Sequence, residues 1–461
     1  MNDMDEGHPN VNGNSGAHVA VIGCGHVGLV IAAGLASLGH EVTGIDVNED
    51  LVGRLNGGRV DLHEPDLPEI VRQGLASGRL AFTARYDEVV PRAEYIFLAV
   101  DTPQTMVGAA DLRNIRAATR SIAANLNGAT PIIINKSTSP IGTGETIEEI
   151  LSTAIEERQH PPRIVSNPEF LRQGSAMWDF FHPDRIVVGS RSRADAEAVV
   201  ALYASLPGKV IVTDLRTAEM IKYVANAFLA TRVSFINEIA RLCEQIHTDI
   251  DTVVEGVSHD PRIGNHFFRP GIGYGGSCLP KDVAALRYIG ETMGVATPVL
   301  SAVQEINAVA KTSAVRRLRA RLGPLEGRTI GVWGLTFKGG TEDTRESPAM
   351  DVVGLLRNEG ALVHAYDPAV AQDHRRVPVA VRPILRDTPL EAATGADALA
   401  ILTDWPEFRE VDLASVRDAM TGRVVFDGRN MLDKGHVEGL GFAYLGVGRV
   451  ATSHRRRLAD R

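Results

Sequence analysis

The sequence predicts an α/β protein with two Rossmann-like, doubly wound domains joined by a long central helix. Three observations indicate this fold class. Short apolar runs alternate with amphipathic stretches of helical length, a GxGxxG turn follows the first run, and one unusually long helical stretch separates two such α/β regions. Strands that alternate with helices form a parallel sheet that is covered on both faces.

The first predicted domain covers residues 17–213 and follows a polar tail of residues 1–16. Its expected strands are the apolar runs "HVAVIG", "EVTGID", "EYIFLAV", "TPIIINK", "RIVSN", "DRIVVG" and "KVIVTD". The tail, "MNDMDEGHPNVNGNSG", lacks the basic patch and apolar stretch of a signal peptide. We therefore expect the tail to be disordered.

Residues 214–323 are predicted to form a helical domain. Apolar residues recur at helical spacing through "AEMIKYVANAFLATRVSFINEIARLCEQI", which predicts one long helix. A second helical stretch, at about 297–322, ends at "GPLEG" because Gly and Pro break the pattern. A second α/β domain is expected over residues 324–450, with the runs "RTIGVWGLTF", "DVVGLLRNEG", "ALVHAYDP", "ADALAILTD" and "RVVFDGRN". Residues 451–461 are expected to be a flexible basic tail.

Composition argues against several classes of protein. The 461 residues include 48 Lys and Arg against 57 Asp and Glu, a net charge of -9 that argues against a general nucleic-acid binder. The three cysteines are too few and too scattered for a disulfide framework or a thiolate metal site. We therefore expect a reducing, cytoplasmic environment and no bound metal. No apolar run reaches the ~18 to 20 residues of a membrane span, so no membrane partner is expected.

The turn "GCGHVG" places Gly23, Gly25 and Gly28 in GxGxxG spacing. The first glycine allows a tight turn, the second lets a pyrophosphate approach the backbone, and the third permits close helix packing. The next strand ends at Asp46, which is placed to bond a ribose 2′-hydroxyl and would repel a 2′-phosphate. NAD is therefore favoured over NADP. The alternative is a glycine-rich turn without a ligand, but the flanking strand and helix favour the cofactor site.

Other residues near this motif have simpler interpretations. Thr102 and Pro103 follow the strand "YIFLAV" at its carboxyl end, where the ligands of open α/β sheets lie. Cys24 lies inside the glycine turn, and we expect it to be small apolar filler.

The stretch "GYGGSCLPKD" places Cys278 after a glycine run and before Lys281 and Asp282. A thiol near a cation or a helix N-terminus is partly thiolate at neutral pH and can attack a carbonyl carbon. The alternative is a buried cysteine that acts as a small hydrophobe. The glycines at positions 273, 275 and 276 would leave room for a ligand, and burying the two charged residues needs a reason. Both observations favour a nucleophile.

Lys222 and Asn226 lie four residues apart on the long helix and therefore project from one face. The alternative is a solvated face with no function. Glu169 and Thr138 each follow a predicted strand, and Arg262 lies in a loop. The residues by themselves do not show that these segments meet.

Taken together, these motifs resemble the UDP-glucose/GDP-mannose dehydrogenase family. The resemblance spans residues 17 to about 445 and includes, in family order, "GCGHVG", "KSTSP", "SNPEFLRQGSA", "HPDRIVVG", "EMIKYVANAFLATRVSFINE", "PRIG", "GYGGSCLPKD", "GLTFKGGTEDTRES" and "FDGRN". It implies an NAD-binding N-terminal domain, a C-terminal domain that helps to bind a UDP-sugar, and a long helix that makes a homodimer or higher homo-oligomer.

The resemblance also implies a role for individual residues. The implied catalytic residues are the nucleophile Cys278, then Lys222, Asn226 and Asp282 around the reacting C6 group, the base Glu169, and Thr138, which positions a water. The implied cofactor residues are Gly23, Gly25, His26, Val27, Gly28, Asp46, Thr102, Pro103, Thr138, Gln173 and Arg345. The implied substrate residues are Glu169, Phe170, Leu171, Lys222, Asn226, Arg262, Phe267, Tyr274, Gly275, Phe337, Lys338 and Arg429.

The implied reaction is the NAD-dependent four-electron oxidation of UDP-glucose at C6 to UDP-glucuronate, a precursor for polysaccharides, through thiohemiacetal and thioester intermediates on the cysteine. The alternatives are the same chemistry on GDP-mannose or UDP-N-acetylmannosamine, and a nucleotide-binding protein without catalysis. Three residues depart from the family pattern and bear on the affinity for NAD. Gln173 replaces a frequent acid, His26 a frequent tyrosine, and Asp101 a small or amide residue.

Overall fold

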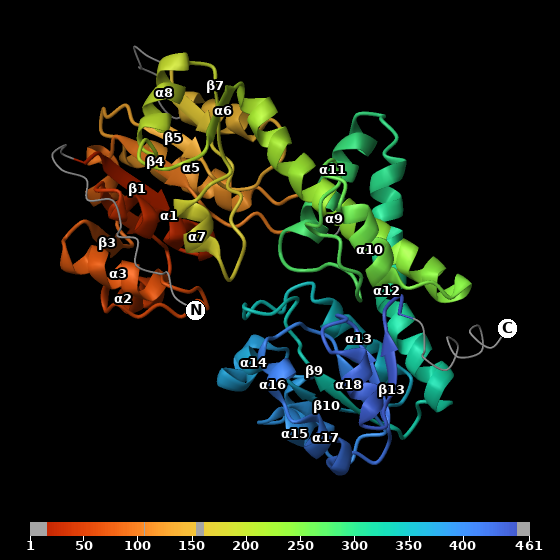
Figure 1. The fold of residues 1–461 in the computed structure, drawn as a ribbon. Coiled ribbons are helices and arrows are strands. Elements are labelled where there is room, and N and C mark those ends of the chain that lie inside the picture. Colours follow the sequence, from red (N-terminus) through yellow and green to blue (C-terminus); the bar gives the residue numbers. More distant parts are fainter. Residues whose placement is uncertain (1–15, 106, 154–160, 450–461) are drawn as a thin grey trace. The chain divides into compact units, whose positions relative to one another are not determined.

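The computed structural model describes residues 16–105, 107–153 and 161–449. The chain divides into two compact units, Met1–Val224 and Ala225–Arg461, and each is described by itself (Figure 1). The expectations for the two tails, residues 1–16 and 451–461, lie outside the described residues except at Gly16.

Unit 1 is built on a sheet that has eight strands among the described residues, in the order β3-β2-β1-β4-β5-β6-β7-β8. The strands are β1 (His18–Ile22), β2 (Glu41–Ile45), β3 (Leu80–Thr83), β4 (Tyr95–Leu98), β5 (Ile132–Asn135), β6 (Arg163–Ser166), β7 (Arg185–Ser190) and β8 (Lys209–Thr213). The seven strands expected from the sequence are present. Strand β3 was missed, because its run "LAFT" has only two buried apolar residues, Leu80 and Phe82, and no continuous apolar stretch like those of β4 and β5.

The expectation of a purely parallel sheet is wrong at one pair. Strands β6 and β7 run antiparallel, while the other neighbours are parallel. The connection between them holds one helix, α7 (Ala176–Phe181), of six residues. Six helical residues span only about 9 Å, too little to carry the chain back along the sheet. The chain therefore enters β7 on the carboxyl side of β6 and runs in the opposite direction.

Helices cover both faces of this sheet. They are α1 (His26–Ser37), α2 (Glu49–Asn56), α3 (Leu67–Ala76), α4 (Tyr86–Val89), α5 (Arg113–Asn125), α6 (Thr143–Thr153), α7 and α8 (Arg193–Ala201). Side chains alternate along β1, so Val19 and Val21 join the core under α1, whereas Ala20 and Ile22 join the core on the opposite face.

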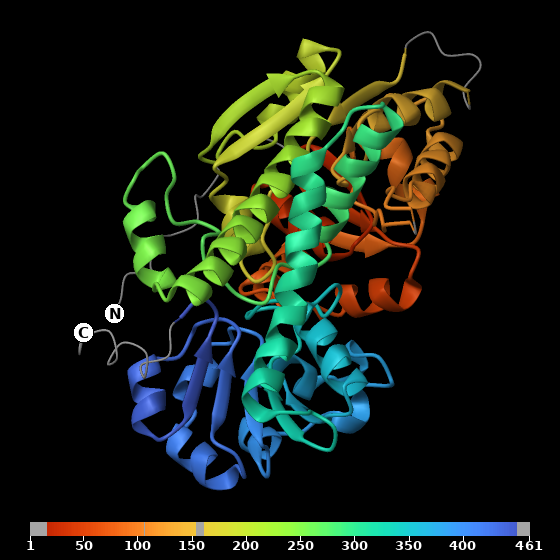
Figure 2. The same cartoon turned by 90° about the vertical axis from the view of Figure 1, so that its right-hand side faces the viewer.

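The long central helix is α9 (Leu215–Ile246), which begins in unit 1 and continues into unit 2. It is followed by α10 (Ile250–Ser258), α11 (Leu279–Thr292) and α12 (Pro298–Leu322). Within unit 2, α9 and α12 lie side by side (Figure 2), and the Ser234 hydroxyl on α9 donates a hydrogen bond to the carbonyl of Val303 on α12. Both long helices expected from the apolar periodicity are therefore confirmed.

The remainder of unit 2 is a second doubly wound domain. Its sheet has the order β10-β9-β11-β12-β13 among the described residues, with every pair parallel. The strands are β9 (Thr329–Trp333), β10 (Leu362–Tyr366), β11 (Ala398–Ile401), β12 (Val424–Asp427) and β13 (Ala443–Gly446). The helices are α13 (Pro348–Asn358), α14 (Pro368–Gln372), α15 (Pro389–Ala393), α16 (Glu407–Glu410), α17 (Leu413–Ala419) and α18 (Lys434–Gly439). The predicted fold class is confirmed.

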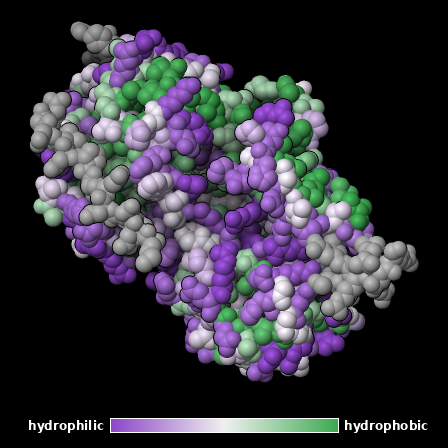
Figure 3. Space-filling view, in the orientation of Figure 1, coloured by the Kyte–Doolittle hydropathy of each residue, from purple (hydrophilic) through white to green (hydrophobic). Residues whose placement is uncertain are grey.

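Every helix in the described part of the chain is too short or too polar to cross a membrane. Hydrophilic and hydrophobic residues are intermixed over the surface that Figure 3 shows.

Candidate active site

The glycine turn between β1 and α1 has the geometry of a dinucleotide site. A Cβ atom at Gly23, where φ is +90°, would lie 2.8 Å from the carbonyl oxygen of Ala99, and one at Gly28 would lie 1.7 Å from the oxygen of Gly23. The backbone itself therefore excludes side chains at both positions. A Cβ at Gly25 would have nothing within 4 Å. This open space in front of the N-terminus of α1 is where a pyrophosphate fits.

Asp46 follows β2 and fixes the turn. Its Oδ2 accepts a hydrogen bond from the amide of Cys24 at 2.8 Å, and its Oδ1 accepts one from the amide of Asn48 at 2.9 Å. Cys24 is buried, and burial together with the nearby Asp46 carboxylate raises the pKa of its thiol. The expectation that Cys24 is filler is consistent with this inert environment.

Thr102 and Thr138 come together at the carboxyl ends of β4 and β5. The Thr102 hydroxyl donates a hydrogen bond to the carbonyl of Thr138 at 2.5 Å. Strand order reverses between β1 and β4, so these threonines, with Pro103, lie at the topological switch point where doubly wound sheets bind ligands. The residues present therefore fit NAD.

Glu169, after β6, and Lys222, on α9, form an ion pair with 2.9 Å between Oε1 and Nζ. They are only 6% and 4% exposed, so Lys222 does not belong to a solvated face. Burial would raise the pKa of Glu169, but the Lys222 charge, its hydrogen bond and the Leu171 amide outweigh burial and lower it. Glu169 is therefore ionised at neutral pH. Phe170 lies under the same lysine, with its ring centre 5.4 Å from Nζ.

A second buried lysine, Lys136, was missed by the sequence reasoning. Its Nζ donates a hydrogen bond to Asn167 Oδ1 at 3.0 Å and lies 5.5 Å from the centre of the Tyr203 ring. Burial lowers its pKa to about 7, with attraction by Glu169 opposing and repulsion by Lys222 adding to the shift. The available signal was a lysine that directly follows the buried strand "IIIN" and begins the motif "KSTSP".

In unit 2, Cys278 is the N-cap residue of α11 and is exposed. One turn into the helix, Asp282 is fully buried. Its carboxylate accepts hydrogen bonds from Asn226 Nδ2 and Lys281 Nζ, both at 2.6 Å. Three predicted residues, Cys278, Asp282 and Asn226, are thus brought close by α11 and α9. Lys281, for which the sequence offered no role, compensates the buried charge.

The expectation that the glycines before Cys278 leave room for a ligand is wrong. A Cβ at Gly275 would lie 2.2 Å from the carbonyl oxygen of Glu346, and one at Gly276 would lie 3.0 Å from the Phe337 ring. The space is filled by the protein itself, because this loop packs directly on the segment after β9. Tyr274 lies between Gly273 and Gly275 and is buried. Burial raises the pKa of its phenol to about 12.

Arg429, after β12, ties three predicted segments together. Its Nε donates to the carbonyl of Leu402 at 2.8 Å, its Nη2 to that of Phe337 at 2.9 Å, and its Nη1 to that of Gly273 at 3.4 Å. Lys338 directly follows Phe337 in the chain, and its Nζ lies 5.8 Å from the centre of the Phe337 ring.

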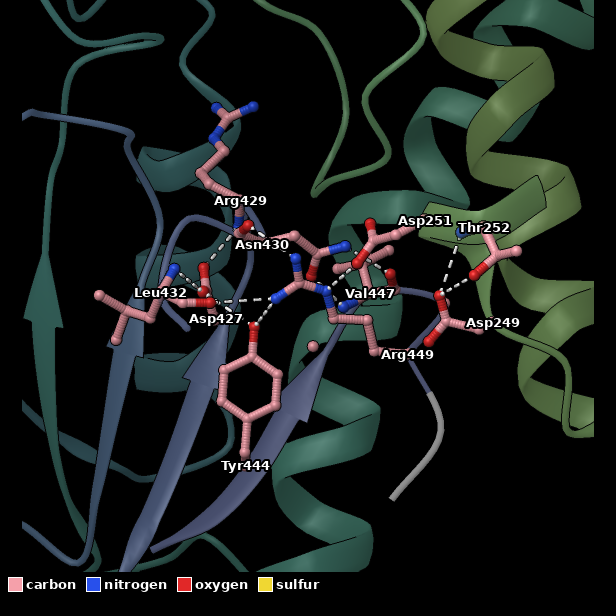
Figure 4. Close-up of polar contacts among 12 residues, drawn as sticks. Asp249, Asp251, Thr252, Asp427, Arg429, Asn430, Leu432, Tyr444, Val447 and Arg449 are labelled. Carbon is pink, nitrogen blue, oxygen red and sulfur yellow. Dashed lines mark hydrogen bonds and ion pairs between the residues drawn. The ribbon is translucent and has the colours of Figure 1, made fainter. Parts of the chain in front are cut away.

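A pocket of about 590 Å³ opens next to Arg429. Its charged lining residues are Arg269, Arg409, Arg429, Arg449, Asp251, Glu255 and Asp404. Figure 4 shows how one wall is held, since Arg449 donates to Asp251 Oδ2 and to the Tyr444 hydroxyl, both at 2.6 Å. Four arginines against three acids leave one net positive charge among these residues, which suits an anionic ligand. Of these arginines, only Arg429 belongs to one of the sequence motifs, "FDGRN".

Three predicted residues of unit 2 are neither hydrogen-bond partners of Arg429 nor lining residues of this pocket. Arg262 is exposed and pairs with Asp260 at 2.6 Å, and Arg345 pairs with Asp343 at 2.7 Å. Phe267 has a positive φ of 58° and is 39% exposed. Among the described residues, no group of His, Cys, Asp and Glu is arranged to hold a metal ion.

The fold and the glycine turn define an NAD-binding oxidoreductase built from two doubly wound domains. The chain matches the NAD-binding domain of the UDP-glucose/GDP-mannose dehydrogenase family over residues 17–207, its central domain over 216–309 and its UDP-binding domain over 331–434. The protein belongs to this family, and its cofactor is NAD.

Named relatives agree with this placement. The chain is 40% identical to a UDP-glucose 6-dehydrogenase of Bacillus subtilis, over 94% of this chain and 93% of the relative. It is 42% identical to a UDP-glucose 6-dehydrogenase of Pseudomonas aeruginosa, over 95% and 98%. The solved UDP-glucose dehydrogenase of Pyrobaculum islandicum superposes with a TM-score of 0.86 at 37% identity, over 96% of this chain and 100% of that one.

Proposed function

We propose that the protein oxidises UDP-glucose at C6 to UDP-glucuronate, with two NAD molecules consumed per sugar. The observation that carries the proposal is an exposed cysteine at the N-cap of α11, one turn from a buried Asp282 that is hydrogen-bonded to Asn226. The relatives named as UDP-glucose 6-dehydrogenases support the choice of sugar.

Each group has a chemical task in this proposal. NAD, when bound, accepts a hydride from C6. Removal of the hydroxyl proton and the hydride gives an aldehyde, and the Cys278 thiolate adds to its carbon, forming a thiohemiacetal. Loss of a second hydride and of the hydroxyl proton gives a thioester. Water then breaks the C–S bond, and the carboxylate product leaves with the thiol restored.

Lys222 and Asn226, one turn apart on α9, stabilise the oxyanion, a contribution of roughly 3 kcal/mol for each donor. Glu169 is ionised by its ion pair with Lys222 and is the base that activates water, while Thr138 positions that water. Asp282 is the second group that handles protons. The basic pocket beside Arg429 suits the diphosphate of the nucleotide.

A second nucleotide sugar is the principal alternative. A solved UDP-D-ManNAc dehydrogenase of Pyrococcus horikoshii superposes with a TM-score of 0.82 at 29% identity. This identity is lower than that of the relatives named for UDP-glucose, which favours the glucose substrate.

The proposal is tested by incubating the protein with NAD and UDP-glucose, GDP-mannose or UDP-N-acetylmannosamine, and measuring NADH per sugar consumed. Two NADH from UDP-glucose, with little from the other sugars, are expected. One NADH per sugar would refute the four-electron reaction, and no NADH from any sugar, despite NAD binding, would indicate a protein without catalysis.

The thioester route is tested with Cys278→Ser. This variant is expected to lose steady-state turnover by about 10³-fold or more, because a hydroxyl is a far poorer nucleophile at neutral pH. Cys243→Ala, at a buried cysteine, is the matched control and should retain turnover. Full turnover by Cys278→Ser would refute the covalent route.

Two further features belong to this proposal. We expect a homodimer or higher homo-oligomer, because α9 carries exposed apolar residues in unit 2. We also assign the protein to the cytoplasm, because no disulfide joins its three cysteines.

A further inference from the structure

Glu64 is a buried carboxylate that none of the sequence motifs includes. It lies between α2 and α3, and its side chain is 1% exposed. Its Oε1 lies 2.6 Å from Nε2 of His26 and also accepts a hydrogen bond from the amide of Gly174, while Oε2 accepts one from the amide of Ala176 at 3.0 Å. The imidazole donates this hydrogen bond in the tautomer that carries its proton on Nε2. In that tautomer, one imidazole and two backbone amides donate to a single buried carboxylate.

These donors belong to two functional segments. His26 is the first residue of α1 and lies inside the glycine turn that binds NAD. Gly174 and Ala176 belong to the segment 169–176, which follows β6 and begins with the ion-paired Glu169. The two segments leave different strands of the sheet and are far apart in the sequence. Glu64, from a third segment, bonds to both.

We propose that Glu64 and His26 are positioning residues that hold the NAD turn and the segment 169–176 in one arrangement. A buried carboxylate that loses a donor keeps its desolvation cost, so neither segment moves away from Glu64 without penalty. Cofactor binding at the turn is thereby linked to the placement of Glu169. This second half of the inference rests on the proposed function, whereas the first half rests on NAD binding alone.

The residue at position 26 gives the inference a specific form. The phenol of a tyrosine, like an imidazole, can donate one hydrogen bond from an aromatic ring. His26→Tyr should therefore preserve the link to Glu64. His26→Phe keeps the ring and removes the donor, and Glu64→Gln keeps the size and removes the charge.

The first experiment measures NAD affinity by calorimetry without any sugar. His26→Phe and Glu64→Gln are expected to weaken NAD binding about tenfold, the usual effect of losing a hydrogen bond to a charged group. His26→Tyr, which keeps a hydrogen-bond donor on the ring, should bind NAD more tightly than His26→Phe. The matched control is His18→Phe, because His18 and Glu41 form a histidine–glutamate pair with 3.0 Å between Nδ1 and Oε2 on the exposed surface of the same unit. Unchanged NAD affinity in both His26→Phe and Glu64→Gln would overturn the inference.

The second experiment measures kcat at saturating NAD and saturating nucleotide sugar. Because saturation removes the effect of weaker binding, a fall in kcat of about tenfold in His26→Phe reports reacting groups displaced within the bound complex. The kcat of the double variant His26→Phe with Glu64→Gln should be no lower than that of the more impaired single variant, since both changes break the same link. A lower melting temperature with unchanged kcat, or fully additive losses, would show a purely structural role and refute the link.

The outcomes separate this inference from the proposed function. If the natural chain oxidises no UDP-glucose, the proposed function fails, while the NAD-affinity result still decides the first half of the inference. If the natural chain is active and the two variants bind NAD normally, the inference fails and the function stands. If Glu64→Gln does not fold, the NAD affinities of His26→Phe and His26→Tyr decide the first half. Both variants should fold, because the His26 side chain is 19% exposed.

Discussion

Lys136 and Lys222 are two buried lysines that share one buried carboxylate, Glu169. Lys222 makes the direct ion pair, whereas Lys136 hydrogen-bonds to the Asn167 side chain and interacts with Glu169 electrostatically. Asn167 is in turn held by the Tyr203 hydroxyl at 2.9 Å and the Val187 carbonyl at 2.7 Å. The loop that carries Glu169 is therefore anchored through side chains that the motif "SNPEFLRQGSA" does not reveal.

Lys136 predicts a dependence of stability on pH. Its pKa is about 7 in the folded chain and about 10.4 when unfolded, so between these values the unfolded chain binds more protons. The destabilisation is complete below pH 7 and is relieved as pH rises towards 10.4, by about 1.4 kcal/mol per pH unit at most. Urea titrations at pH 7, 8 and 9 should show a smaller rise in the free energy of unfolding for Lys136→Met than for the natural chain. Lys209→Met, on the exposed end of β8, should behave as the natural chain does. Parallel curves for Lys136→Met and the natural chain would contradict the prediction.

Helices α6 and α9 are joined by another buried acid, Glu219. Its carboxylate accepts hydrogen bonds from the amides of Gly142 and Gly144 at 2.7 and 2.8 Å and from the Ser166 hydroxyl at 3.2 Å. It therefore occupies the N-terminal end of α6, where backbone amides have no partner within the helix. Glu219 and Lys222 lie one turn apart on α9, so the same helix face is attached to the sheet at two points.

Glu219 predicts a stability change of the opposite sign. Burial raises its pKa to about 7, although the two amides and the serine hydroxyl oppose the shift. Between pH ~4.5 and 7 the folded chain therefore keeps a proton that the unfolded chain loses, and stability falls as pH rises through this range. Glu219→Gln removes this contribution, worth about 3 kcal/mol at most. The free energy of unfolding should be measured for Glu219→Gln and the natural chain at pH 5 and pH 8. Relative to the natural chain, the variant should be more stable at pH 8 than at pH 5. An equal difference at both pH values would refute the prediction.

Unit 2 presents an uncovered apolar face on α9. Phe228, Phe235, Leu242 and Ile246 recur at spacings of seven and four residues, which places them on one side of the helix, and they are between 49% and 66% exposed. A contiguous exposed apolar face of this kind marks an interaction site. The resemblance to the family makes a second copy of the chain the expected partner.

This face predicts the oligomeric state. We expect the natural chain to form a homodimer or higher homo-oligomer in light scattering. The double variant Phe228→Glu with Leu242→Glu should be a monomer, because a charge buried in an apolar interface costs several kcal/mol. Val379→Glu, at an exposed position on the C-terminal domain, is the control and should remain dimeric. Retention of the dimer by the double variant would exclude this face as the interface.

The alternation of strands and helices, the glycine turn and the long helix could be predicted because each depends on local periodicity or on backbone geometry. Gly23 and Gly28 are required by contacts within one βα turn, so their spacing is visible in the chain. The motif around Cys278 was likewise visible, since α11 itself brings Asp282 within one turn of the thiol. The role assigned to the glycines before that cysteine was wrong, because the atoms that fill their space, on Glu346, Phe337 and Asn307, come from distant segments.

The sequence by itself determined the fold class, the NAD turn and the family, because each rests on periodicity or on short motifs whose residues are neighbours in the chain. Tertiary structure decided which charges are buried and what compensates them. Glu64, Lys136 and Glu219 gave little or no periodic signal, because each acquires its function from partners on other strands or helices. Burial and charge pairing across such distances are properties of the packed sheet and its helices, and a pattern along the chain contains no record of them.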